Sequence, residues 1–185
     1  DLTALSVEEL VEGELLVTEL MYDPRSVDDG VGEWIEVYNN SGENVDLSGL
    51  VFSDGEGTDT IDLSIEIEDG EYALFCIDAD STVNGGLSCD FEYTSSIAMS
   101  NSGDQMTLSN KTLTIDTVDY DASGFDDPSG ASISLDPDFY DFKSNDSGTS
   151  WCPASTVYST SYDKKGAIDE EDEGTPGTAN DECSG

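Results

Sequence analysis

The stretches GELLVTELMYDP (13–24) and GEWIEVYNN (32–40) decide the fold of this chain. Both are short runs rich in β-branched, aliphatic and aromatic residues, which is the composition of half-buried β-strands. The first run ends at Asp23-Pro24, and proline is confined to the ends and edges of sheets. The second run leads into the turn sequence NNSGEN (39–44). Both stretches therefore predict strands of ordinary length.

More short strands follow, spaced by about ten residues and bounded by Gly, Asp or Ser. No stretch shows a long helical periodicity, so the whole pattern is typical of an all-β sandwich or barrel. The further predicted strands are 45–53, 60–67, 70–78, 90–93, 104–110, 112–120, 131–136 and 150–158.

The two ends of the chain differ from this middle part. Residues 1–13 form an N-terminal arm, in which Ser6 and Glu9 have the spacing of a capping box; either a short helix or an extended arm fits. Residues 14–160 make the sandwich domain. Residues 161–185 form an acidic C-terminal strap, and its run DEEDE (169–173) is typical of a solvated stretch.

The charge balance excludes several classes of function. The 185 residues include 43 Asp or Glu, 5 Lys or Arg and no His, which gives a formal net charge of -38. Nucleic acids and anionic membranes are bound through Lys and Arg, so neither is an expected partner. Without His there is no Ser-His-Asp catalysis. With so many carboxylates, pairs that resemble the acid and the nucleophile of a glycosidase are expected by chance, so we expect no enzyme. No apolar run approaches a membrane-spanning length and no signal peptide is present, so we expect a soluble or already processed chain.

Four cysteines, Cys76, Cys89, Cys152 and Cys183, allow three pairings. No C-x-x-C spacing is present, and an even number of cysteines favours an oxidising compartment outside the cell. We prefer the local pairs Cys76–Cys89 and Cys152–Cys183. Four reduced cysteines in a cytosolic protein are the alternative.

One loop has the alternating oxygen side chains of a calcium site. Asp78, Asp80, Thr82 and Asn84 recur at every second position, as at the start of a Ca²⁺-binding loop. The glycine at position six and the glutamate at position twelve of an EF-hand are missing, so an EF-hand is excluded. The alternative is a solvated turn whose Asp side chains bond to nearby amides. Weaker candidates are Asp28, Asp29 and Glu33; Asp119 and Asp121; and Asp126 and Asp127.

Four motifs occur in order along the chain: GELLVTELMYDP, GEWIEVYNNSGENVDLSGLVFSD, SNSGDQMTLSN (100–110) and GTPGTAN (174–180). On these motifs the chain resembles a lamin tail domain from Gly13 to about Asn180. It looks like the bacterial secreted type, in which IDADSTVNGGL (77–87), GASISLD (130–136) and the SWCP segment (150–153) recur. The resemblance implies an immunoglobulin-like antiparallel β-sandwich of about 8–10 strands. It implies less about function, because the family reuses this scaffold as a binding or structural module.

These observations predict a non-enzymatic, extracellular structural or binding module. The arm could add to the sheet edge of another copy and build a head-to-tail homo-oligomer or filament; otherwise it folds on its own domain. Another extracellular protein or a polysaccharide is also a possible partner. The alternative function is a polysaccharide-binding targeting module of a secreted hydrolase. Trp34 and Trp151 are better explained by packing than as a sugar platform. The expected assembly anchors are Leu2, Leu5, Val7, Leu10 and Val11.

Overall fold

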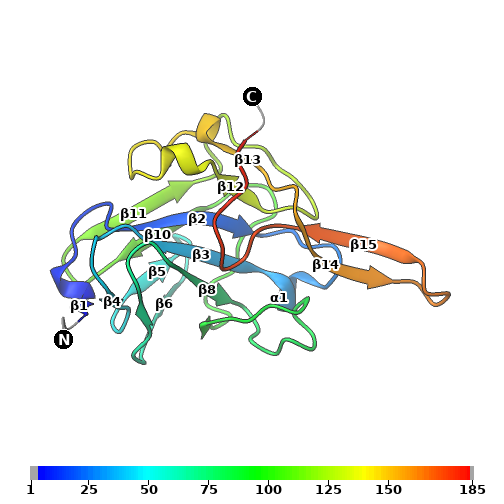
Figure 1. Ribbon diagram of the computed structural model, residues 1–185, viewed down its shortest axis with the longest axis horizontal. Helices are drawn as coiled ribbons and strands as arrows, with labels where there is room; N and C mark the ends of the chain where they lie inside the picture. Colours follow the sequence, from blue (N-terminus) through cyan, green and yellow to red (C-terminus); the bar gives the residue numbers. More distant parts are fainter. Residues whose placement is uncertain (1–3, 184–185) are drawn as a thin grey trace.

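The computed structural model describes residues 4–183, which fold around two packed β-sheets, with a small third sheet, a separate hairpin and short helical turns (Figure 1). The larger sheet has six strands in the order β13-β12-β2-β3-β8-β9, and all its neighbours are antiparallel except β8 and β9. Its strands are β13 (Trp151–Pro153), β12 (Ile133–Leu135), β2 (Leu15–Met21), β3 (Trp34–Asn39), β8 (Tyr72–Cys76) and β9 (Phe91–Glu92).

The second sheet has four antiparallel strands in the order β11-β10-β5-β6. One hydrophobic core lies between the two sheets, where the ring of Phe52 lies 5.4 Å from that of Phe75. The predicted immunoglobulin-like antiparallel β-sandwich is therefore confirmed. The strands of this sheet are β11 (Thr114–Asp119), β10 (Gln105–Ser109), β5 (Val51–Ser53) and β6 (Thr58–Thr60).

A small three-stranded sheet holds the N-terminal arm against the sandwich. It is made of β1 (Leu5–Ser6), β4 (Val45–Asp46) and β7 (Glu66–Ile67), with β1 parallel to β4. A 3-10 turn, η1 (Val7–Glu9), follows β1 and has the predicted capping box, in which Glu9 accepts a hydrogen bond from the Ser6 amide at 2.9 Å. The arm thus combines both expected forms, an extended piece and a helical turn.

The arm is folded on its own domain, which corrects its predicted role in assembly. Val7 and Leu10 are 1% and 3% exposed and belong to the core, and Leu5 packs against it. Such side chains are not free to anchor a neighbouring molecule. Val11 is exposed, and Leu2 lies outside the described residues.

The last pair of strands forms a hairpin that projects from one end of the sandwich (Figure 1). It consists of β14 (Val157–Tyr162) and β15 (Ile168–Glu173). The run 169–173, which the sequence indicated as a solvated stretch, is therefore a strand, and the boundary expected at residue 160 falls within β14. The helical turns are α1 (Asp29–Gly32), η2 (Pro137–Phe139) and η3 (Gly148–Ser150).

Candidate interaction surface on the C-terminal hairpin

The base of the hairpin is fixed by an aromatic contact on the outer face of the six-stranded sheet. The rings of Tyr158 in β14 and Trp34 in β3 meet edge to face, with centroids 5.9 Å apart. The indole Nε1 of Trp34 also donates a hydrogen bond to the Tyr158 hydroxyl at 3.1 Å. Trp34 is fully buried, and Trp151 is buried with its Nε1 donating to the Asn145 carbonyl. Both tryptophans therefore have packing roles, and neither forms an exposed platform.

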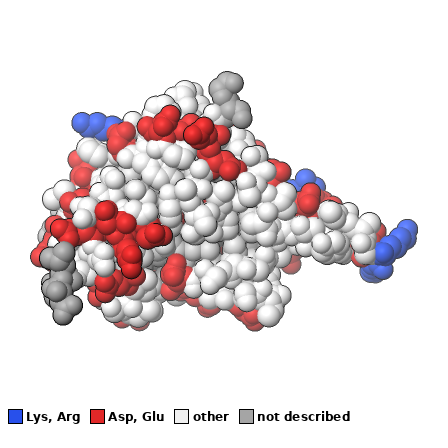
Figure 2. Space-filling model, viewed as in Figure 1, with Lys and Arg blue, Asp and Glu red and all other residues white. Residues whose placement is uncertain are grey.

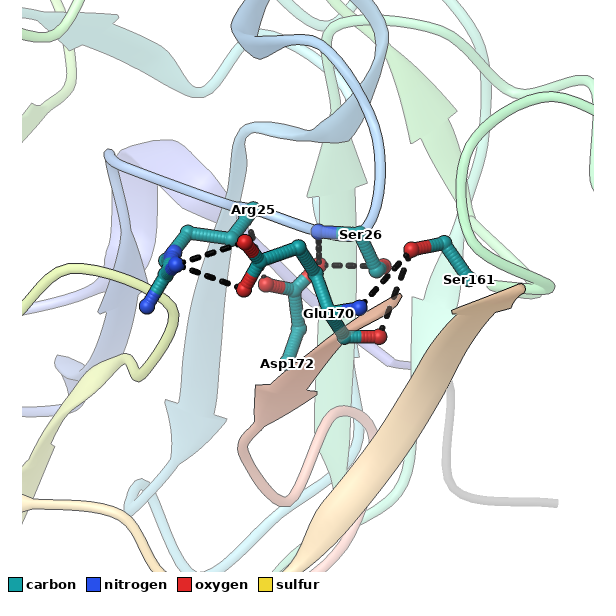
Figure 3. Close-up of polar contacts among 5 residues, drawn as sticks. All are labelled: Arg25, Ser26, Ser161, Glu170 and Asp172. Atoms are coloured by element: carbon teal, nitrogen blue, oxygen red, sulfur yellow. Dashed lines mark hydrogen bonds and ion pairs between the residues drawn. The ribbon is translucent and has the colours of Figure 1, made fainter. Parts of the chain in front are cut away.

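A buried carboxylate joins β15 to the loop after β2 (Figure 3). Asp172 has no exposed surface, and its two oxygens accept hydrogen bonds from the amides of Arg25 at 2.6 Å and Ser26 at 3.1 Å. The Ser26 hydroxyl donates to the same carboxylate at 2.5 Å and lies 2.6 Å from the Ser159 hydroxyl of β14. Since hydrogen bonds to a charged group are the stronger kind, this cluster holds both strands of the hairpin to the sandwich.

A second, more exposed set of contacts lies one step farther along the hairpin. The Arg25 guanidinium pairs with Glu170 at 2.6 Å, and the Ser161 hydroxyl accepts a hydrogen bond from the Glu170 amide at 3.1 Å (Figure 3). Both charged side chains are partly in solvent, so the ion pair contributes at most about 1 kcal/mol. The anchored part of the hairpin therefore ends near Ser161 and Glu170.

Beyond these contacts, the segment 162–168, here called the hairpin tip, exposes large apolar side chains. Tyr162 and Ile168 are cross-strand partners and are 64% and 58% exposed. Apolar residues that lie together on a projecting element typically mark a contact surface. A two-stranded hairpin is also only marginally stable alone in water. Both arguments indicate that the tip is suited to contact a partner.

The tip also carries positive charge on an otherwise acidic protein. Lys164 and Lys165 lie in the turn between the strands, and Figure 2 shows Lys and Arg atoms at the far end of the hairpin. The one carboxylate of this turn, Asp163, accepts hydrogen bonds from the amides of Lys165 at 2.7 Å and Ala167 at 2.9 Å. The charge of Asp163 is therefore directed at the backbone, and the ion pairs among residues 4–183 involve neither Lys164 nor Lys165.

Two buried glutamates fix the segment that follows the hairpin. Glu19 in β2 and Glu36 in β3 are direct cross-strand partners, and neither is exposed. Glu19 accepts hydrogen bonds from the Ser132 hydroxyl, from the Thr175 amide at 3.0 Å and from the Thr175 hydroxyl at 2.9 Å. Glu36 accepts from the Gly177 amide at 2.8 Å. The two carboxyl groups thus hold the terminal segment (174–183) over the six-stranded sheet.

Burial changes the acidity of these carboxyl groups. It raises the pKa of Glu19 to about 7, although hydrogen bonds from Ser132 and Thr175 act in the opposite direction. Burial and then the neighbouring Glu19 charge raise the pKa of Glu36 well above its usual range. Burial also raises the pKa of Asp116 to about 7, where Asn145 and the Val17 amide donate to it. Glu19 and Glu36 bond to the terminal segment, and Asp116 bonds to Asn145 and to the Val17 amide, so all three carboxyl groups hold parts of the fold together.

The candidate calcium loop is held by hydrogen bonds within itself. Asp78 accepts from the Asp80 amide at 2.8 Å, and Asp80 accepts from the Thr82 amide at 2.9 Å. Asn84 is buried, and its amide group bonds to the carbonyl of Asp78 and the amide of Leu87. Among residues 4–183, no three His, Cys, Asp or Glu side chains are grouped to hold a metal ion. Calcium binding at this loop stays a prediction.

The structure brings three of the weaker calcium candidates together, because Asp121, Asp126 and Asp127 line one hollow. Asp29 opens α1, where Asn101 donates to it at 3.1 Å, and Glu33 is mostly buried. Burial and then the Asp29 charge raise the pKa of Glu33 to about 8. Asp119 ends β11. The remaining candidates, Asp28, Asp121, Asp126 and Asp127, lie outside the strands and helices and are exposed.

All four cysteines are paired as the sequence favoured. Cys76 is bonded to Cys89, and Cys152 to Cys183. The first bond ties β8 to the loop before β9, and the second ties β13 to the terminal segment. No helix within residues 4–183 is long and apolar enough to cross a membrane. The disulfides fit a non-reducing environment.

The sequence reasoning missed the hairpin and both of its anchors. One pattern could have indicated it: Asp163-Lys-Lys-Gly166 is a turn sequence between two runs of strand length, VYSTSY (157–162) and IDEEDE (168–173). The many carboxylates of the second run instead predicted a solvated stretch and not a strand. The contacts of Asp172 and Glu19 join residues about 150 positions apart, such as Glu19 and Thr175, with a sequence separation of 156. No local pattern reports such contacts.

Comparison with known proteins agrees with this fold. The family model described as Lamin Tail Domain matches residues 10–122, more than half of the chain. No curated protein and no solved structure matches this chain. The matched residues run from the end of the arm through β11, so the hairpin and the terminal segment lie outside them.

Proposed function

We propose that this chain, which belongs to the lamin tail domain family, is an extracellular, non-enzymatic module that associates with copies of itself through the hairpin tip. The family is an immunoglobulin-like structural and protein-interaction module. The two disulfides of the chain support the extracellular part of the proposal. No cofactor is needed for this role.

One observation carries the proposal: the hairpin is anchored at its base, while its tip exposes an apolar pair beside two lysines. The base is held by Trp34 and Asp172, so the tip is presented in one orientation. Preorganisation of this kind lowers the entropy cost of binding. The net charge of -38 makes another copy of the chain a surface that attracts the lysines.

Sedimentation velocity across a concentration series tests the proposal. The full chain is compared with the double variant Tyr162→Ser/Ile168→Ser at physiological ionic strength, where repulsion between acidic bodies is screened beyond about 8 Å. We expect the full chain to shift toward larger species with concentration, and the variant to sediment as a monomer.

A matched control is Val11→Ser/Leu113→Ser, which removes two apolar side chains that are exposed elsewhere. This control should associate as the full chain does. A full chain that stays monomeric throughout, or a tip variant that associates normally, would contradict the proposal.

A hollow beside the hairpin base favours polysaccharide binding as a second candidate function. It has a volume of about 410 Å³ and is lined by Tyr72, Tyr158 and Asp90, together with the backbone of Gly85 and Gly86. Aromatic faces with a carboxylate and backbone groups are suited to sugar rings. Trp34 contacts Tyr158, so its fluorescence should change on titration with oligosaccharides, and Tyr72→Ala should abolish that change. An unchanged spectrum across neutral and cationic oligosaccharides would exclude this function.

A further inference from the structure

A second hollow lies at the open side of the sandwich, between β6 and β9. Each of these strands is the last in its sheet. The hollow has a volume of about 340 Å³, and two apolar residues, Leu63 and Phe91, form part of its wall. Leu63 is 47% exposed, so this wall is accessible from solvent. Four carboxylates also line the hollow, which we call the edge pocket: Asp59, Asp62, Asp90 and Glu92.

Three of the carboxylates are held in place by backbone amides. Asp59 accepts a hydrogen bond from the Thr94 amide at 2.6 Å, Asp90 from the Leu74 amide at 2.8 Å, and Glu92 from the Ala79 amide at 2.9 Å. Among residues 4–183, the ion pairs present are Arg25–Glu170 and Lys111–Glu8, and neither involves the pocket. The pocket therefore concentrates fixed negative charge around an accessible apolar wall, and no cation of its own chain neutralises it.

The hairpin tip has the complementary composition. It combines two cations, Lys164 and Lys165, with the exposed apolar pair Tyr162 and Ile168. The pocket combines carboxylates with an apolar wall. Attraction between cations and carboxylates gives specificity for the partner and speeds association, and the apolar contact supplies affinity. We propose that the hairpin tip of one copy docks into the edge pocket of a second copy, an inference that rests on the proposed self-association.

The position of the tip and the pocket fixes the type of assembly. The hairpin projects away from the sandwich (Figure 1), whereas the pocket is lined by residues of β6 and β9 at the open side of the sandwich. Two different surfaces of the chain meet, so the contact is heterologous. In a complex of two copies, one copy keeps a free pocket and the other keeps a free tip. Repeated contacts then produce an open chain or a ring, and a symmetric dimer is not expected.

Two charge-reversal variants test the contact. The tip variant is Lys164→Glu/Lys165→Glu, and the pocket variant is Asp62→Lys/Glu92→Lys. Alone, each should sediment as a monomer, because each has lost one of the two surfaces. Mixed in equal amounts, they should form a complex of two copies and no larger species, because the intact tip of one fits the intact pocket of the other.

Matched controls keep the net charge of each variant but change other places. Lys111→Glu/Lys143→Glu is the control for the tip, and Asp126→Lys/Asp127→Lys for the pocket; all four residues are exposed. Both controls should associate as the full chain does. Melting curves of all variants establish that each is folded before sedimentation is interpreted.

The outcomes separate this inference from the proposed function. If the pocket variant associates like the full chain while the tip variant does not, the edge pocket is not the acceptor, and self-association through the tip stands. If the tip variant also associates normally, both ideas are wrong. If the full chain is monomeric at every concentration, both are equally overturned. A mixture that stays monomeric, when each variant alone is monomeric, also excludes the docking.

Discussion

The N-terminal arm and the C-terminal hairpin flank the same sandwich, and both carry apolar residues, yet they place those residues in opposite environments. The arm buries Val7 and Leu10 in the core between the sheets. The hairpin buries polar groups at its base, Asp172 above all, and exposes Tyr162 and Ile168. The sequence left open whether the arm serves assembly or folds on its own domain; the structure shows the arm folded on its own domain and the apolar pair of the hairpin exposed.

The difference teaches that apolar content does not identify a binding element unless burial is known. A short apolar segment gains about 25 cal/mol for each Å² that it removes from water, and it gains this from its own core or from a partner. In the arm, pairing of β1 with β4 brings the side chains onto the core. In the hairpin, the two anchored strands extend past the sandwich, so the tip has no core within reach.

The largest effect should come from removing the covalent anchor behind the hairpin. Cys152→Ala/Cys183→Ala opens a loop with a sequence separation of 31 and should lower the free energy of unfolding by about 4 kcal/mol on the chain-entropy model. Cys76→Ala/Cys89→Ala is the matched comparison, with a separation of 13 and a loss of about 3 kcal/mol. Urea denaturation measures both; a smaller loss for the longer loop would contradict the model.

The arm should be the next most sensitive region. Leu10→Ala removes a side chain that is 3% exposed and should cost about 3 kcal/mol of unfolding free energy, because a cavity replaces it in the core. Val11→Ala, at the next position, alters a side chain that is 56% exposed and should cost less than about 0.5 kcal/mol. Equal losses in thermal or urea denaturation would show that the arm does not pack as described.

The buried pair Glu19 and Glu36 should make stability depend on pH. Burial raises the pKa of both carboxyl groups, to about 7 for Glu19, so the folded state binds protons more tightly than the unfolded one. This contribution is fully present below the unfolded pKa near 4.5 and is lost as pH rises through the folded pKa. From pH 5 to pH 8 the melting temperature should fall, on the order of 5 °C.

The variant Glu36→Gln separates this pair from the general repulsion among surface charges. It removes one of two neighbouring buried charges, so the fall in melting temperature with pH should become smaller. The informative quantity is the slope of the melting temperature against pH, because a lost hydrogen bond lowers stability at every pH and leaves this slope unchanged. Glu71→Gln, at an exposed position, should leave the slope unchanged. A slope that is the same in both variants would remove the pair from the explanation.

Much of the sandwich was predictable, because its strands follow local rules. The runs 13–24 and 32–40 contain strands β2 and β3, which the structure places at Leu15–Met21 and Trp34–Asn39. The predicted strand 45–53 is two strands, β4 and β5, since the chain turns at Gly49, where φ is +92°. Glycine alone adopts this conformation readily, but the sequence did not show which glycine requires it.

The candidate site was less predictable, for a physical reason. The acidic strand β15 contradicts its own composition, because Asp and Glu are poor strand formers. It is held by contacts that cross the whole chain, such as Asp172 with the Arg25 amide, separated by 147 residues. Local propensity was overridden by tertiary hydrogen bonds, which no window of sequence contains.

The smallest effect on stability should come from the hairpin tip itself. Tyr162 and Ile168 are cross-strand partners but are mostly in solvent, and a cross-strand pair contributes about 0.2–1 kcal/mol. Tyr162→Ser/Ile168→Ser should therefore change the unfolding free energy by less than about 1 kcal/mol. At the base, Tyr158→Ala loses a ring that packs on Trp34 and should cost clearly more. Comparable losses at the two positions, measured by urea denaturation of dilute protein, would mean that the tip is part of the stable fold and not a surface kept for a partner.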